Sequence, residues 1–229
     1  MGTDIYTQRS EEDFFKARNK ALFNDLQHFL VPDESKLLSF SEIKQMLKPQ
    51  NDVYKGMEAV PVKDIVGSEG RYHDFDNHFF PRNMHLKSRW TSIDKAHLQN
   101  IILPPIVLYE IGGLYFVRDG NHRVSVAKAQ GVEMIDAEVV SLQSEIKLKS
   151  GMSIRQIQKA VIHYEKRVFY NETAFGDITD CWNLDFSTPG QYDVLYQHIQ
   201  IHKYFINQTR SEEISTEDAI LSWYHTLYI

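Results

Sequence analysis

The sequence predicts an α+β fold, in which a small sheet lies between helical segments. The middle of the chain contains short apolar runs rich in β-branched and aromatic residues, which are typical of strands. Both flanks instead carry apolar residues at helical spacing. Hydrophobic residues make up 42% of the 229 and charged residues 24%, so a sizeable core is available. We therefore expect a helical extension over residues 1–56, a core over 57–142 and a C-terminal helical region over 143–229.

The core section predicts four strands and one short helix. Gly112-Gly113 separates two of the apolar runs and is typical of a hairpin. Small and apolar residues from about 124 to 130 predict a helix of two to three turns, which Gly131 ends. The expected strands lie at residues 59–62, 106–109, 114–117 and 137–140.

The flanks predict helices with recognisable ends. A first helix begins near residue 11 and ends at Pro32, and a second follows Ser39 and ends before Pro49. The C-terminal region is expected to hold three more helices, which begin near Ser153, Tyr192 and Ser215.

Charge and cysteine content exclude several classes of protein. The formal net charge is -6, whereas a protein that grips duplex DNA by its phosphates shows a basic excess or a basic stripe. Cys181 is the single cysteine, which excludes an internal disulfide framework and a CxxC metal site. No stretch approaches the roughly 20 apolar residues that span a bilayer, and the first residues lack a secretory signal pattern. We expect a cytoplasmic protein with no membrane partner and no resident metal site.

The loop Asp119-Gly120-Asn121-His122-Arg123 joins an expected strand to the short helix. Gly120 allows a sharp turn and a close approach of the backbone to a ligand. The helix N-terminus that follows offers unpaired N–H groups to an anion. Asn121 and His122 add side-chain donors, and Arg123 adds a planar fork suited to phosphate oxygens. Asp119 is suited to hold a metal ion or orient a hydroxyl. These features predict a phosphate-binding loop.

Each part of this loop also has a structural interpretation. A Gly-Asn pair forms ordinary turns, Asp119 is able to cap the helix, and Arg123 is able to pair with a surface carboxylate. Spacing alone leaves these alternatives open.

Three residues outside the loop are further candidates. Asp74 and Asp76 are candidate general bases or metal ligands. Glu110 is another possible base, for which a surface position at a strand end is the alternative.

The segment Leu103–Val140 resembles the end of a ParB N-terminal domain. There an apolar strand, a hairpin, a Gly-x-x-Arg loop, a helix with small residues and a final strand follow in the same order. The segment Ala59–Trp90, which contains Arg71, is similar to the opening strand and arginine-containing box of that domain. The resemblance covers about residues 57–142 and implies a mixed-sheet core of the ParB/sulfiredoxin-like superfamily.

The flanks are similar to uncharacterised bacterial ParB-like proteins. The similarity lies in residues 66–76, 198–205 and 222–224. It extends over nearly the whole chain and implies an architecture rather than a reaction.

Three activities use this loop in the superfamily. ParB proteins bind CTP and DNA, sulfiredoxins transfer phosphate from ATP to an oxidised cysteine, and free-serine kinases use an Asp-Gly-His-His-Arg-like loop for phosphoryl transfer. Asn121 stands where sulfiredoxins keep their catalytic cysteine, and Cys181 lies far away in the sequence. A sulfiredoxin reaction is excluded because its attacking thiolate is missing.

The resemblance first implies a nucleotide-binding protein that acts as an ATP- or ADP-dependent phosphotransferase or nucleotidase. Residues 120–123 would cradle the phosphates with help from Arg71. Asp119 or Asp74 would bind Mg²⁺ or act as the base. The phosphate acceptor, a small molecule or a protein, is not identified.

The alternative is a ParB-like module that binds CTP, as a transcriptional or partition-type regulator, without transferring phosphate. The acidic balance and the lack of a recognition helix after residues 38–47 count against direct DNA contact. A third option is a scaffold whose loop binds nothing.

Overall fold

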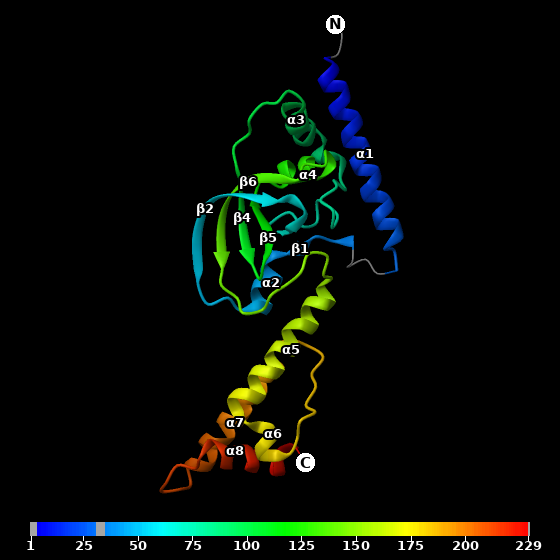
Figure 1. Ribbon diagram of the computed structural model, residues 1–229. Helices are drawn as coiled ribbons and strands as arrows, with labels where there is room; N and C mark the ends of the chain where they lie inside the picture. The colour runs from blue at the N-terminus through cyan, green and yellow to red at the C-terminus, as the bar shows by residue number, and fades with distance from the viewer. Residues whose placement is uncertain (1–3, 31–34, 229) are drawn as a thin grey trace. The chain divides into compact units, whose positions relative to one another are not determined.

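The computed structural model describes residues 4–30 and 35–228, which form two compact units, Met1–Ile154 and Arg155–Ile229 (Figure 1). We call them the sheet unit and the helical unit. Within the described ranges, no helix is long and apolar enough to cross a membrane.

A mixed sheet forms the centre of the sheet unit, and its strand order is β1-β3-β5-β4-β6-β2 across the described residues. The β4–β5 and β2–β6 pairs are antiparallel, whereas β1–β3, β3–β5 and β4–β6 are parallel. This mixture confirms the predicted α+β class. The strands are β1 Leu38–Ser39, β2 Asp52–Pro61, β3 Ile65–Ser68, β4 Ile106–Ile111, β5 Leu114–Asp119 and β6 Met134–Leu142.

Four α-helices accompany the sheet in the described part of this unit: α1 Ile5–Gln27, α2 Phe40–Leu47, α3 Lys87–Leu98 and α4 Asn121–Ala129. A short 3₁₀ turn, η2 Val62–Asp64, lies between β2 and β3, and another, η3 Met84–Leu86, directly precedes α3. Helix α1 packs along α3, and α3 packs on α4 (Figure 1). Trp90 of α3 is fully buried beside Phe14 of α1 and donates its indole N–H to Ser125 of α4 at 2.8 Å. One aromatic side chain therefore ties three helices together.

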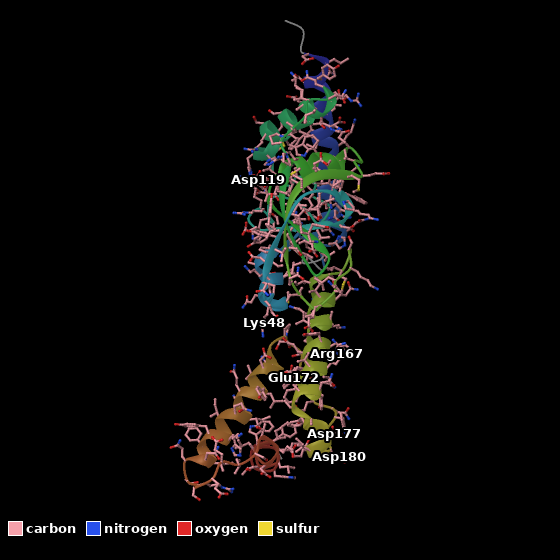
Figure 2. The ribbon with its side chains drawn as sticks, turned by 60° about the vertical axis from the view of Figure 1, so that its left-hand side comes forward. Lys48, Asp119, Arg167, Glu172, Asp177 and Asp180 are labelled. Atoms are coloured by element: carbon pink, nitrogen blue, oxygen red, sulfur yellow. The ribbon has the colours of Figure 1, made fainter. Side chains whose placement is uncertain are left out.

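The helical unit has its own core. It contains α5 Ile154–Thr173, α6 Phe175–Thr179, α7 Gln191–Asn207, α8 Thr216–Trp223 and a final turn, η4 Tyr224–Tyr228. Phe175 and Ile199 are fully buried in an aromatic-rich cluster. Charged side chains lie on its surface, among them the labelled Arg167, Glu172, Asp177 and Asp180 (Figure 2). The aromatic residues of this cluster therefore form the core of the helical unit.

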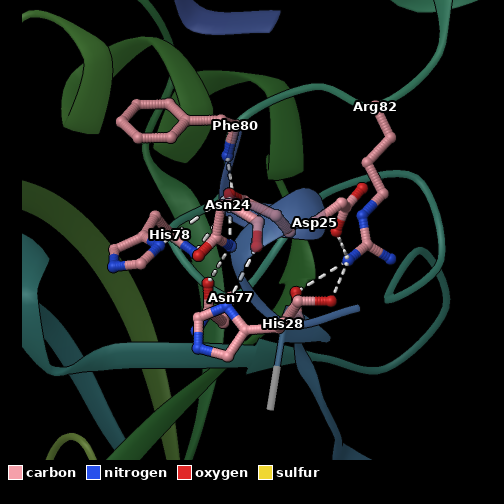
Figure 3. A network of polar contacts seen from close by, with 9 residues as sticks. Asn24, Asp25, His28, Asn77, His78, Phe80 and Arg82 are labelled. Atoms are coloured by element: carbon pink, nitrogen blue, oxygen red, sulfur yellow. Dashed lines mark hydrogen bonds and ion pairs between the residues drawn. The ribbon is translucent and has the colours of Figure 1, made fainter. Parts of the chain in front are cut away.

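A buried carboxylate organises the loop after β3 in the sheet unit. Asp76 has no exposed surface and accepts hydrogen bonds from the backbone N–H groups of Phe80 (2.7 Å) and His78 (3.0 Å). The side chain of Asn24, on α1, donates to Asp76 at 2.9 Å (Figure 3). Nearby, Arg82 pairs with Asp25 of the same helix at 2.6 Å (Figure 3). The carboxylate of Asp76, considered above as a base or metal ligand, is thus committed to holding this loop on α1.

Most expected elements are present with different bounds. The predicted strand at 59–62 is the end of the longer β2, and the predicted C-terminal helices correspond to α5, α7 and α8. The sequence analysis missed β1, β3, α3 and α6. Pro32, the expected end of the first helix, lies outside the described residues. The first compact unit ends at Ile154, and α1 and α2 contribute buried residues to the sheet unit.

Replacing Asp76 with alanine should destabilise the sheet unit strongly. The N–H groups of His78 and Phe80 and the amide of Asn24 would lose a common acceptor. Leaving buried donors unpaired costs about 1–3 kcal/mol for each group, so we expect the free energy of unfolding to fall by about 3 kcal/mol or more. Urea unfolding measures this change. Asp52→Ala, at an exposed position in β2, is the control and should change stability by less than about 0.5 kcal/mol. Equal stability of the two variants would contradict the role given to Asp76.

Candidate functional site

A cavity of about 200 Å³ opens at the N-terminus of α4. The turn between β5 and α4, the loop after β3, and α3 form its walls. Its lining residues are Arg71, Arg89, Ile93 and the whole loop Asp119–Arg123. The structure thus brings Arg71 to the predicted loop.

Gly120 makes the sharp passage from β5 into α4. Its φ is +107°, in the left-handed region that favours glycine. A Cβ at this position would lie 2.5 Å from Cγ2 of Ile106 in β4, so space as well as backbone conformation demands glycine. The first helical bond runs from Val124 N–H to Gly120 C=O at 3.0 Å. The N–H groups before Val124 have no intrahelical acceptor and are available to an anion.

Two residues that line this cavity each have a buried side-chain atom without a protein partner. Asn121 is 8% exposed and His122 is 6% exposed. Asn121 Oδ1 and His122 Nε2 nevertheless make no hydrogen bond to any residue the structure describes. A buried polar group without a partner is unfavourable by about 1–3 kcal/mol. Such groups at a cavity wall indicate a place where a ligand supplies the missing partners.

The imidazole of His122 is held neutral. Its ring packs edge-on against Phe75, with 5.6 Å between ring centroids. Burial, and then the positive charges of Arg71 and Arg89, lower the pKa of His122 to about 4. At neutral pH the ring therefore has one N–H donor and one acceptor nitrogen. His122 is able to donate to a phosphate oxygen without carrying a charge of its own.

Arg71 is anchored at the rim of the cavity. Its guanidinium lies 3.2 Å from Asp74, and the other oxygen of Asp74 lies 3.8 Å from His85. The backbone N–H of Arg71 also contacts the hydroxyl of Ser68, at the end of β3, at 3.4 Å. The Arg71 side chain remains 53% exposed, so it is oriented but still accessible to a ligand. Asp74 therefore positions Arg71 at the rim of the cavity.

Arg123 is engaged in holding the loop. Its guanidinium donates to the carbonyl oxygens of Pro104 and Pro105, at 2.7 Å for Pro105. It also pairs with Asp119 at 2.5 Å. Arg123 is mostly buried, whereas the Asp119 side chain is 66% exposed and is labelled at the surface in Figure 2. Arg123 thus holds the segment that leads into β4 against the loop. Its pairing with the exposed carboxylate of Asp119 is the structural alternative to phosphate binding that the sequence left open.

Arg89 is a cavity residue that the sequence analysis missed. It lies on α3, next to Trp90, whose buried indole holds that helix on α4. Arg89 is exposed, and no residue in the described ranges pairs with it. Leu86, Trp90 and Ile93 recur at helical spacing, the sequence signal that identifies α3. Arg89 is consequently the less constrained of the two arginines at the mouth of the cavity.

Glu110 lies apart from this site. It sits on β4 opposite Tyr115 of β5. Tyr115 precedes Asp119 by four residues, which corresponds to roughly 13 Å along the strand. It contacts the Ser141 hydroxyl, pairs with Lys55 at 3.4 Å and accepts from the Gly113 N–H at 3.0 Å. Burial opposes the charged form, but these contacts together lower its pKa. Glu110 therefore stabilises the hairpin and is too distant to act as a base in the cavity.

Neither a metal cluster nor a known relative identifies the site. The described residues contain no group of three or more His, Cys, Asp or Glu able to hold a metal ion. Comparison of the chain with models of known families, with curated proteins and with solved structures found no match.

The lowered pKa of His122 predicts a loss of stability in acid. Below pH 6.5 the unfolded chain takes up a proton on this histidine, whereas the folded state resists it down to about pH 4. The stabilisation is complete above pH 6.5 and is lost as pH falls through this window. It amounts to about 2 kcal/mol after allowance for solvent screening. Urea unfolding at pH 7 and pH 4.5, followed by circular dichroism, measures it.

His122→Gln should flatten this pH dependence, because glutamine stays neutral throughout. The exposed His73→Gln is the control and should retain the wild-type dependence. An unchanged acid loss in His122→Gln would contradict a neutral, buried imidazole.

Proposed function

We propose that the sheet unit is a nucleotide-binding module of the ParB/sulfiredoxin-like superfamily, and that the cavity at the start of α4 binds the nucleotide's phosphates. The observation that carries this proposal is the pair of unpartnered buried atoms, Asn121 Oδ1 and His122 Nε2, on residues that line the same cavity as Arg71 and Arg89. The side-chain amide of Asn121 presents N–H or oxygen to a ligand according to its rotation.

Charge favours an anion of this type. The N-terminus of α4, Arg71 and Arg89 all contribute positive potential at the same place. Neutral His122 adds a donor without extra charge repulsion. A phosphate has enough acceptor oxygens to engage the backbone, the imidazole and both guanidinium groups together.

The volume of the cavity is sufficient for the phosphates of a nucleotide but not for its base and sugar. Pockets that enclose a whole drug-sized ligand begin at about 300 Å³, and this cavity holds about 200 Å³. The base and sugar therefore extend beyond it. This geometry does not select ATP, ADP or CTP, so the base has to be identified by experiment.

Phosphoryl transfer or hydrolysis is the first chemical role within this proposal. Asp119 lies at the cavity and would hold Mg²⁺ or orient the attacking hydroxyl, which requires its release from Arg123. Asp74 would have to leave Arg71 in the same way. Added phosphate charge at the arginines would weaken both pairs and free the carboxylates.

Binding without transfer is the second candidate role, and one observation favours it. Both acids near the cavity, Asp119 and Asp74, are paired with arginines. A CTP-binding regulator needs only the phosphate contacts, so these carboxylates would serve as positioning residues. The net charge of -6 does not support general DNA binding in this role.

Arg89→Ala should weaken nucleotide binding by about tenfold or more. An ionic hydrogen bond to phosphate contributes about 1.5–3 kcal/mol, and 1.4 kcal/mol corresponds to tenfold in affinity. Arg89 makes no ion pair with the described part of the protein, so the variant should fold normally. Calorimetric titration with ATP, ADP, CTP, GTP and AMP, each with and without Mg²⁺, gives the dissociation constants. Arg155→Ala, an exposed arginine of the helical unit, is the matched control.

Turnover separates the two chemical roles. ³¹P NMR of the best-bound nucleotide, with wild type and Asp119→Asn, detects release or transfer of phosphate. Turnover that falls in Asp119→Asn while affinity remains identifies an enzyme, and tight binding without turnover identifies a regulator. Equal affinity of wild type and Arg89→Ala, or no binding of any nucleotide, would overturn the assignment of the cavity.

A further inference from the structure

A second, larger cavity lies at the other end of α4. It has a volume of about 670 Å³, in the range of sites that enclose a small organic molecule. Val62, Phe80, Val132 and Met134 contribute apolar walls, and Lys63 and Lys128 contribute amines. Lys128 follows Asn121 by seven residues on α4, roughly 10 Å along the helix axis. The two cavities are therefore at opposite ends of one helix.

Lys128 is held in this cavity in an unusual environment for a lysine. Its Nζ donates to the carbonyl oxygen of Ile65 at 2.8 Å and lies 4.9 Å from the centroid of the Phe79 ring. No carboxylate in residues 4–30 and 35–228 is within ion-pair distance of it. Lysine side chains normally keep their ammonium in water or against an acid. This amine is instead fixed in position against a backbone carbonyl and an aromatic face.

Burial makes this amine more easily deprotonated than other lysines. Desolvation lowers the pKa of Lys128 to about 8, although the negative charges of Asp76 and Asp64 act in the opposite direction. Lys63, His78 and Glu133 are the other ionisable groups at the wall of the cavity. A substantial fraction of Lys128 is therefore the neutral, nucleophilic amine near pH 7.5, whereas an ordinary lysine is almost fully protonated.

We propose that this cavity is a binding site for small aldehydes with an apolar body, which Lys128 holds as a Schiff base. A lysine amine that is fixed in position and partly deprotonated, at the wall of a largely apolar cavity, is able to form such adducts. Nζ attacks the carbonyl carbon, a proton passes from the nitrogen to the carbonyl oxygen, and the resulting carbinolamine loses its hydroxyl and the remaining N–H proton as water to give the imine. The apolar walls bind the body of the aldehyde, and Asp64 and Asp76 stabilise a protonated imine at a distance. The site is independent of the nucleotide cavity.

Borohydride trapping tests the proposal on the full chain. The protein is incubated with limiting benzaldehyde at pH 7.5, reduced with sodium borohydride and mapped by peptide mass spectrometry. Lys128 should carry the benzyl group at least about tenfold more often than Lys63, which lines the same cavity but is exposed. The labelling should saturate as benzaldehyde increases. Arg89→Ala should label as wild type, because its cavity is separate.

Two variants keep the test decisive. Lys128→Met should lose the preferred label, and circular dichroism verifies that it folds. Met134→Trp narrows the cavity and should reduce benzaldehyde labelling of Lys128 while formaldehyde labelling persists. Equal labelling of Lys128 and Lys63 would overturn the proposal. So would labelling of Lys128 that does not saturate and is unaffected by Met134→Trp, since that result describes a reactive amine without a binding site.

Discussion

The close contact between Gly120 and Ile106 controls the geometry on which the candidate site depends. Gly120 has a φ of +107°, and a Cβ on it would lie only 2.5 Å from the Ile106 side chain. Because glycine is accommodated there, the chain passes from β5 into α4 through this single residue. The unpaired N–H groups of the helix therefore lie directly at the edge of the sheet. Arg123 reinforces this junction by joining Asp119 to the two prolines before β4. A bulkier residue at position 120 would displace the helix start and, with it, Asn121 and His122.

Helix α4 is buried along much of its length, and both of its ends bear functional groups. Val124 and Ser125 have no exposed surface, and Ser125 accepts the indole N–H of Trp90. Burial around the first turn keeps His122 neutral, and burial around the last turn keeps Lys128 partly deprotonated. The same physical cause, desolvation, thus acts on two basic groups in one direction. The arginines and the helix dipole coincide at one end, where we propose phosphate binding, and Lys128 lies at the other.

The sequence predicted the hairpin, the loop and α4 because each carries a strong local signal. Gly112-Gly113 marks the hairpin, and Gly120 marks the turn before the helix. Strand β3 was missed because Gly67 interrupts its short apolar run. That glycine is required there, since a Cβ would lie 2.4 Å from the Leu38 carbonyl oxygen. Helix α3 was missed because its surface is largely polar, and Arg89 was missed with it.

The candidate site was foreseen only in part, for a physical reason. Local sequence identified Asn121 and His122, and the resemblance to ParB-like domains implied Arg71, but pairing between distant segments decides which groups are free. Arg123 turned out to be engaged by backbone carbonyls of Pro104 and Pro105, and Glu110 by Ser141 and Lys55. Such tertiary pairings leave no periodic trace in a single sequence. The unpartnered atoms of Asn121 and His122 likewise emerge only when burial is known.

The most direct measurement of the central claim is the NMR titration of the His122 ring with and without pyrophosphate. A bound phosphate group places negative charge at Nε2 and favours the protonated ring. The account predicts that the pKa of His122 rises from about 4 toward or above its ordinary value of 6.5 when the ligand is present. A His122 titration that is unchanged at saturating pyrophosphate would contradict the claim that phosphates bind at the start of α4.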